Sequence, residues 1–353
     1  MQSRRSVILC CIGLAILAGI PRAHGAPVFQ DCQIGAADSV TRLQARCTTL
    51  VVPEDRAHPE GRKIGLHIAV LKARASKPQP DPLFFLAGGP GQAATEAYVQ
   101  EAPAFDRIQA DRDVVLVDQR GTGESNRLDC PAASGLPDDA TAAAVDRAVD
   151  ACLKQLPGDP RYYTTSVAVQ DLDAVRAALG YPSIDLYGIS YGTRVALQYL
   201  REYPGHTRSV VLDGVVPADL ALGPDVSLDA QHALGLIFIR CDRDPACHKA
   251  FPDPSGAFAG LRRDLGYRAV SVTLRDPLSG APRTEDLTWS KVAQAVRLMS
   301  YQSETASLLP LLIHQAAVKH DYAPLMGTAL IFSSEIESDF AEGMANSVLC
   351  TED

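Results

Sequence analysis

The stretch IDLYGISYG, residues 184–192, decides the fold of this 353-residue chain. Its first four residues predict a strand, and Thr193 to Glu202 have the composition of a helix. Between them Ser190 stands two residues from both Gly188 and Gly192. A sharp strand-to-helix turn brings the backbone so close that only glycine fits on either side, and it exposes the serine hydroxyl above the sheet. The order therefore favours a nucleophilic serine over an ordinary serine in a loop.

A second glycine-rich stretch, LAGGPGQ at residues 86–92, also follows an apolar run. Acyl transfer needs backbone N–H groups directed at a developing oxyanion, and glycines let the main chain approach closely enough to supply one. Because Pro90 has no N–H, we expect Gly89 to be one donor and Tyr191, next to the serine, to be the other. An ordinary Gly–Pro turn is the alternative, whereas a dinucleotide or phosphate loop would need sequence signatures that are absent here. The glycines expected to support the turn and this loop are Gly188, Gly192, Gly88 and Gly91.

Apolar runs and helical stretches alternate through the first half of the chain, which predicts the α/β class with a mostly parallel sheet and helices on both faces. LFFL at 83–86 and VVLV at 114–117 are apolar without alternation, as strands buried on both faces should be. Apolar residues at helical spacing predict a crossover helix over 166–179. The predicted strands are Thr48–Val52, Ile64–Lys72, Leu83–Ala87, Val114–Asp118, Ile184–Gly188 and Ser209–Leu212.

The composition of the chain changes after residue 216. Ala- and Leu-rich helical patterns follow, such as Leu228–Arg240 and Ser290–Tyr301, with one isolated alternating run at 270–274. We therefore expect a core over residues 26–216 and a separate helical cap over residues 217–353.

The N-terminus predicts an export signal. Two arginines precede an apolar run over residues 7–20, and small residues precede a cleavage site placed after Gly25. A membrane anchor is the alternative, but it requires roughly 20 apolar residues. Residues 1–25 are therefore expected to leave as a signal peptide, with export to the periplasm or the cell exterior and no stable membrane span afterwards.

Seven cysteines remain after this cleavage. In an oxidising compartment the sequence-local pairs are natural disulfide candidates: Cys32 with Cys47, Cys130 with Cys152, and Cys241 with Cys247. Cys350 is then unpaired. A zinc site at Cys241, Cys247 and His248 is disfavoured because the spacing matches no standard ligand pattern. A formal net charge of −9 without basic clusters argues against nucleic-acid binding, and no metal or organic cofactor is indicated.

A third motif, DQRGTGES at residues 118–125, makes a family resemblance specific. AGGPG, DQRGTGES and GISYG, in this order, resemble the proline iminopeptidase and tripeptidyl aminopeptidase branch of the α/β-hydrolases, over roughly residues 45–216. The end of the cap, near Cys350, is similar to a segment of the tripeptidyl aminopeptidase-like members, and Ala87 matches the exported group where many relatives have histidine. The resemblance implies that Ser190 is the nucleophile and that Asp118 and Arg120 brace the site without a chemical step.

The resemblance also implies an acid and a histidine on loops after later strands, and neither loop is found in the sequence. Asp213 is the best acid within the chain, but a structural role is the stronger interpretation. No histidine follows a strand in the required place. The histidines after residue 25 are His58, His67, His206, His232, His248, His314 and His320. We therefore expect a truncated or partial member that lacks the last strands of the sheet, leaving Ser209–Leu212 at a sheet edge.

The expected activity is that of a serine aminopeptidase of the prolyl or tripeptidyl type, which forms an acyl-enzyme on Ser190 with a peptide substrate. Glu352 with Asp353, or Glu335 with Glu337, are candidates to receive the substrate ammonium, although a solvated acidic surface is an equal alternative. A carboxylesterase of the same fold and a non-catalytic remnant are the rival functions. The oligomeric state is not determined by the sequence.

Overall fold

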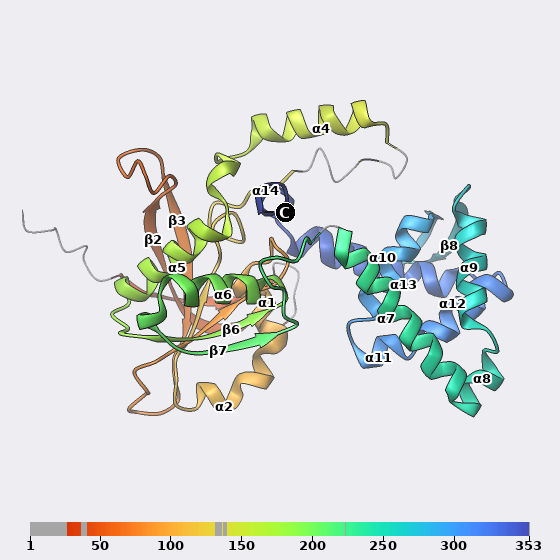
Figure 1. The fold of residues 1–353 in the computed structure, drawn as a ribbon, viewed down its shortest axis with the longest axis horizontal. Helices are drawn as coiled ribbons and strands as arrows, with labels where there is room; N and C mark the ends of the chain where they lie inside the picture. Colours follow the sequence, from red (N-terminus) through yellow and green to blue (C-terminus); the bar gives the residue numbers. More distant parts are fainter. Residues whose placement is uncertain (1–26, 37–40, 131–135, 137–139, 223, 353) are drawn as a thin grey trace, which may run out of the picture.

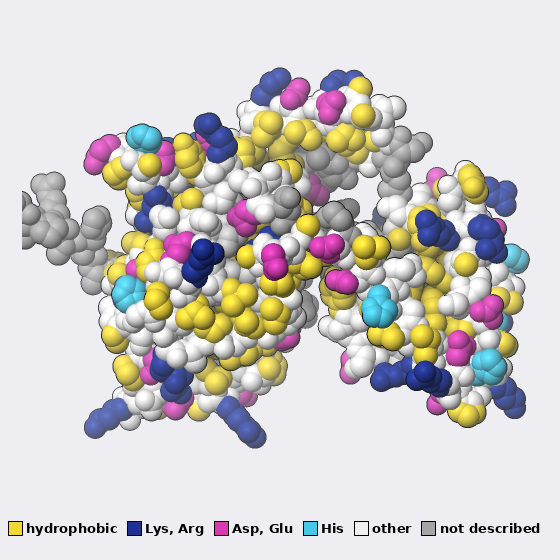
Figure 2. Space-filling view, in the orientation of Figure 1, with side chains coloured by type: hydrophobic (Ala, Val, Ile, Leu, Met, Phe, Trp, Pro, Cys, Tyr) yellow, Lys and Arg dark blue, Asp and Glu magenta, His cyan; other side chains and the backbone are white. Residues whose placement is uncertain are grey.

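The computed structural model describes residues 27–36, 41–130, 136, 140–222 and 224–352, and these residues form two lobes (Figure 1). One lobe holds a seven-stranded sheet, and the other is built from helices and one hairpin. The space-filling view has a deep indentation below the narrow connection between the lobes (Figure 2). The signal predicted for residues 1–25 lies outside the described residues. None of the helices within the described ranges is long and apolar enough to span a bilayer.

The sheet of the first lobe has the strand order β1-β2-β3-β5-β4-β6-β7. The three N-terminal strands run antiparallel to their neighbours, whereas β5, β4, β6 and β7 are mutually parallel. All six predicted strands form. The sequence missed β1, whose side chains are mostly polar and exposed and therefore lack an apolar pattern. The strands are β1 Gln30–Ile34, β2 Leu43–Pro53, β3 Lys63–Leu71, β4 Leu83–Leu86, β5 Val114–Val117, β6 Ile184–Ile189 and β7 Thr207–Asp213.

The two central strands are apolar without alternation because both faces of the sheet are covered. Phe84 and Val115 pack in one core cluster with helices α5 (Thr165–Ala178) and α6 (Tyr191–Glu202). The alternate residues, among them Phe85, pack in a second cluster with α1 (Ala94–Glu101) on the other face. This arrangement confirms the predicted crossover helix and the predicted α/β class.

Shorter helices complete the first lobe. Helix α4 projects from it across the top of the view in Figure 1, and only Ala148 and Cys152 of its side chains are buried. A disulfide joins Cys152 to Cys130, and the predicted pairs Cys32–Cys47 and Cys241–Cys247 also form. Cys350 is free and exposed, as expected. The remaining short elements are η1 Ala102–Phe105, α2 Asp106–Gln109, α4 Ala142–Gln155, η2 Pro160–Tyr162 and η3 Pro204–His206.

The second lobe has its own apolar core, to which Leu234, Phe258 and Ile313 belong. The alternating run at 270–274 is not an isolated strand: it lies in β8 and pairs antiparallel with β9, whose charged sequence concealed it. The elements of this lobe are α7 Pro224–Arg243, α8 Pro245–Ala250, α9 Pro254–Leu265, β8 Val270–Arg275, β9 Pro282–Leu287, α10 Trp289–Met299, α11 Ser303–Ala306, α12 Leu309–Val318 and α13 Ala323–Asp339.

The last helix, α14 (Glu342–Glu352), departs from the expected cap over 217–353 and returns to the first lobe (Figure 1). Met344 and Val348 are fully buried in the core cluster that contains α5 and α6. The sequence places this helix in the cap because no returning strand is predicted after residue 217. The lobe against which α14 packs depends on the path of the chain after α13, and local sequence patterns do not predict that path.

Candidate active site

Ser190 lies at the turn between β6 and α6 and is exposed. Its φ of 54° and ψ of −123° are unusual for a residue with a side chain, as a strained nucleophile turn requires. A Cβ added to Gly188 would lie 2.3 Å from the Gly192 carbonyl oxygen, and one added to Gly192 would lie 2.2 Å from the Leu86 oxygen. Both glycines are therefore sterically obligatory at this turn.

The glycine-rich loop after β4 passes directly beside the serine. A Cβ added to Gly88 would lie 3.3 Å from the Cβ of Ser190. Gly89 and Gly91 both have φ of +110°, which only glycine adopts readily, and the peptide between Gly89 and Pro90 is cis. Tyr191 is the first residue of α6, so its N–H has no acceptor within the helix. The structure thus brings the expected oxyanion loop and the turn together.

The loop after β5 contains Arg120, which holds several neighbouring elements of the first lobe together. The fully buried guanidinium of Arg120 donates from Nε and Nη2 to the two carboxylate oxygens of Asp171, at 2.6 and 2.8 Å. Its Nη1 also donates to the carbonyl oxygens of Glu54 and Tyr162. A buried charge needs such complete pairing. Arg120 therefore ties β2, the η2 turn and α5 to the loop, and all of its contacts are structural.

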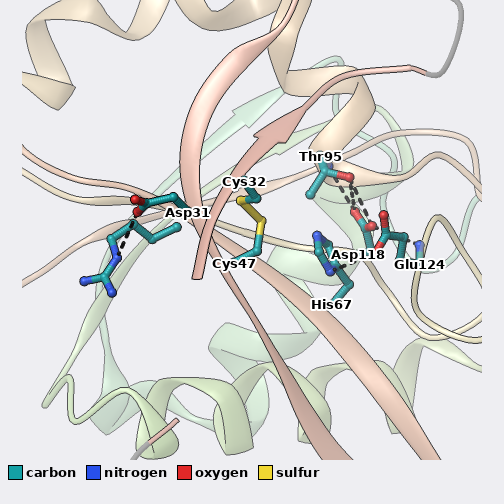
Figure 3. The surroundings of a disulfide bond; sticks show 8 residues. Asp31, Cys32, Cys47, His67, Thr95, Asp118 and Glu124 are labelled. Atoms are coloured by element: carbon teal, nitrogen blue, oxygen red, sulfur yellow. Dashed lines mark hydrogen bonds and ion pairs between the residues drawn. A yellow bond between two sulfur atoms is a disulfide. The ribbon is translucent and has the colours of Figure 1, made fainter. Parts of the chain in front are cut away.

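Asp118 is equally buried and lies next to the start of α1. Its carboxylate accepts hydrogen bonds from the backbone N–H and the hydroxyl of Thr95 and from the backbone N–H of Glu124 (Figure 3). Burial raises the pKa of the Asp118 carboxyl above its ordinary value, and the hydrogen bond from the Thr95 backbone acts in the opposite direction. Its contacts are with the neighbouring loops, which agrees with a bracing role.

The side chain of Tyr191 is buried and joins a polar chain that the sequence did not reveal. Its hydroxyl accepts from Gln119 Nε2 at 3.2 Å and contacts the Thr165 hydroxyl at 2.7 Å. Burial raises the pKa of the Tyr191 phenol. Thr165 in turn donates to Glu352, from its N–H at 2.5 Å and from its hydroxyl at 2.7 Å. Of these hydrogen-bond partners of Tyr191 and Thr165, only Gln119 lies in a motif that the sequence analysis identified.

Glu352 therefore already has an internal partner for both carboxylate oxygens. Its expected role as a receptor for a substrate ammonium stays a prediction. Asp353 lies outside the described residues, as do the side chains of Glu335 and Glu337.

His206, His67 and His58 each have a carboxylate partner. His206 Nδ1 lies 2.7 Å from Asp173, His67 Nδ1 lies 3.3 Å from Glu124, and His58 Nδ1 lies 2.5 Å from Asp55. None of the hydrogen bonds formed within the described ranges joins a histidine to Ser190. Asp213 accepts from the Tyr187 hydroxyl at 2.5 Å, and its backbone oxygen accepts from Ser190 N at 2.8 Å. Ser190 thus lies in the expected turn beside the expected oxyanion loop, without a histidine among its described hydrogen bonds.

Comparison with known families agrees with this geometry. A family model described as the alpha/beta hydrolase fold matches residues 81–237, which contain the glycine loop, the third motif and Ser190. This match and the sheet topology show that the first lobe has the α/β-hydrolase fold.

Among curated proteins, the chain is similar to serine hydrolases of the aminopeptidase-like group. The tripeptidyl aminopeptidase of Streptomyces lividans is 26% identical over 220 residues, covering 57% of this chain and 40% of the relative. Serine protease Hip1 of Mycobacterium tuberculosis (strain ATCC 25618 / H37Rv) is 32% identical over 268 residues, covering 69% and 49%. Carboxylesterase B of Mycobacterium tuberculosis (strain CDC 1551 / Oshkosh) is 33% identical over 258 residues, covering 65% and 49%. The chain spans less than half of the length of each of these relatives.

Proposed function

We propose that this chain is part of an exported serine hydrolase that cleaves peptides near a free N-terminus, with Ser190 as the nucleophile. The observation that carries the proposal is the exposed Ser190, held at positive φ with the Gly88 loop against its Cβ. The similarity to a tripeptidyl aminopeptidase and to a serine protease supports peptides as the substrate class.

In the proposed mechanism, the Ser190 oxygen bonds to the carbonyl carbon of the scissile peptide while a base takes the hydroxyl proton. The N–H groups of Gly89 and Tyr191 donate to the oxyanion that forms. The leaving amine departs with a proton, and water then hydrolyses the acyl ester and restores the serine. No hydrogen bond among the described residues joins a histidine to Ser190, so the base has to be identified by experiment.

Export is supported by the disulfides. Three bridges form between cysteines that are close in sequence, and disulfides persist mainly in oxidising compartments. In this proposal residues 1–25 act as the signal peptide.

A carboxylesterase is the second candidate, and the similarity to carboxylesterase B favours it specifically. It would use the same serine and the same oxyanion loop. The two activities differ in the leaving group and in the requirement for a free amine, so substrates can separate them.

The test is labelling of the purified full chain with a fluorophosphonate over a range of pH, followed by peptide mass mapping, with Ser190→Ala as the control. Labelling at Ser190 whose rate rises through an inflection near pH 6–7 supports a hydrolase with a histidine base. Absence of labelling above the Ser190→Ala level contradicts the proposal and favours a non-catalytic chain. Where labelling occurs, a tripeptidyl anilide, its N-acetylated form and a short-chain acyl ester distinguish the aminopeptidase from the esterase.

A further inference from the structure

The C-terminal segment Phe340–Glu352 contacts both parts of the expected oxyanion hole. On the side of the glycine loop, Ala341 N donates to the Gly91 carbonyl oxygen at 3.0 Å, and Phe340 forms an antiparallel bridge with Gln92. A Cβ at Gly91 would lie 2.9 Å from the Ala341 oxygen, so the two backbones are in direct contact. The segment therefore fixes the loop that carries Gly89.

The other end of the segment reaches Tyr191 through Thr165. Both oxygens of Glu352 accept from Thr165, and the Thr165 hydroxyl contacts the Tyr191 hydroxyl at 2.7 Å. Thr165 and Tyr191 are 4% and 1% exposed, so the hydrogen bond between them is shielded from water, whereas Gln119 and Glu352 at the two ends are half-buried. A buried polar side chain in such a chain is strongly held, because losing its partner leaves an unsatisfied group.

The Glu352 carboxylate determines which group donates in each hydrogen bond of this series. An ionised carboxylate only accepts, so the single hydroxyl proton of Thr165 points to Glu352. Thr165 Oγ1 must then accept from Tyr191, whose oxygen accepts from Gln119 Nε2. The order Gln119 to Tyr191 to Thr165 to Glu352 follows from donor counting alone. Glu352 also lies at the N-terminus of α5, where the helix dipole favours a negative charge.

The middle of the segment anchors it firmly. Met344 and Val348 are fully buried, and Gly343 N donates to the Leu128 carbonyl oxygen at 2.9 Å. A Cβ at Gly121 would lie 2.9 Å from Met344 Cγ, so the loop of the third motif lies directly against α14. The segment is thus held at three places along its length, each of them in the first lobe.

We propose that Phe340–Glu352 is a strap that positions the oxyanion hole, and that Glu352 is its key positioning residue, acting on Tyr191 through Thr165. The strap sets the glycine loop through Ala341 and the first turn of α6 through Glu352. Loss of the carboxylate releases the Tyr191 side chain and shifts its N–H away from the oxyanion. This inference rests on the proposed function, because it assigns a role within the same site.

The test measures how the rate of fluorophosphonate labelling at Ser190 depends on the probe concentration, which gives a binding constant and a maximal rate. It is made on the wild type, Glu352→Gln, Thr165→Val and the double variant. Removal of an oxyanion donor lowers the rate about 10²–10³-fold, and a displaced donor is expected to lower the maximal rate about tenfold with the binding constant unchanged. The double variant should match Thr165→Val, because Glu352 acts on Tyr191 only through the Thr165 hydroxyl. Thr165→Ser keeps the hydroxyl, so its maximal labelling rate should equal that of the wild type. Matched controls in the other lobe are Thr288→Val, at the start of α10, and Glu304→Gln, and both should label like the wild type.

A role in stability alone would lower the melting temperature or the folded fraction and leave the maximal labelling rate of the folded protein unchanged, and that result would overturn the proposal. Hydrogen–deuterium exchange of the peptide over residues 189–195 provides a measurement independent of activity. Faster exchange in Glu352→Gln and Thr165→Val, but not in the controls, is expected, and unchanged exchange contradicts the strap. If the wild type is not labelled while exchange changes as expected, the proposed function fails and the positioning contact stands.

Discussion

The two lobes of the molecule differ in what they bury. Among the described residues, all buried polar or charged side chains lie in the first lobe or in α14, from Thr48 to Arg194 and at Ser347. Where the second lobe's side chains are described, the buried ones are all apolar, and most of them belong to one cluster around Leu234 and Ile313. The first lobe therefore depends on specific pairing and close backbone contact, whereas the second depends on apolar volume.

This difference explains why the recognisable motifs are confined to one lobe. Buried charges and positive-φ turns tolerate one or two residue types, so they leave a specific pattern in the sequence. Apolar helix packing tolerates many substitutions of similar volume, so it leaves only periodicity. The predictions below test this contrast with paired variants, one in each lobe.

The largest difference is expected between two arginines. Arg120→Ala should cost about 3–5 kcal/mol of unfolding free energy, because it breaks a fully buried pair with Asp171. Arg283→Ala, in the second lobe, should cost less than about 1 kcal/mol, since the Arg283 side chain is 44% exposed in its pairs with Asp276 and Glu285. Chemical denaturation of both variants measures this. Equal losses would show that the lobes do not differ in this respect.

The disulfides offer a second comparison. Replacing Cys130 and Cys152 by serine opens a bridge with a sequence separation of 22 and should cost about 3 kcal/mol. Replacing Cys241 and Cys247, with a separation of 6, should cost about 2 kcal/mol. The melting temperatures of the two double variants under non-reducing conditions provide the measurement. A larger loss at the shorter loop would mean that chain entropy does not govern these bridges.

Two glycines should respond in opposite directions. Gly192→Ala is expected to destabilise by about 1–3 kcal/mol, because its Cβ meets the backbone oxygen of Leu86. Gly235→Ala lies within α7 with open space around it and should stabilise by about 0.5–1 kcal/mol. Denaturation midpoints compare the two, and a neutral Gly192→Ala would contradict the close approach at the Ser190 turn.

The smallest effect is expected at the β8–β9 hairpin. The backbone hydrogen bond from Ser279, followed by the side-chain bond from Arg283, lowers the pKa of Asp276 to about 2. A lowered pKa stabilises the folded state above the ordinary value near 4, and this contribution is lost as the pH falls toward 2. The melting temperature of the wild type should therefore exceed that of Asp276→Asn at pH 6, and the gap should narrow below about pH 4 as the pH falls through the folded-state pKa. A gap as large at pH 2 as at pH 6 would exclude the ionised carboxylate as its cause.

Local sequence predicted the elements of the first lobe well because the constraints there are local. The run LFFL predicts a strand buried on both faces, and the glycines around Ser190 predict the turn from sterics alone. The hairpin partner β9 was missed because its residues are charged and exposed. Glu352 was a candidate for another role, but its hydrogen bonds with Thr165 were missed, since a hydrogen bond between residues 187 positions apart has no signature in either neighbourhood.

The sequence by itself determined the class of fold, the serine turn and the glycine loop, because each depends on patterns of consecutive residues. It offered the disulfide pairs as candidates, because the paired cysteines are close along the chain. Only the tertiary structure decided that α14 leaves the second lobe and packs beside α5. Burial of Met344 and Val348 is a property of the whole chain path, and an apolar helix pattern is equally compatible with either lobe.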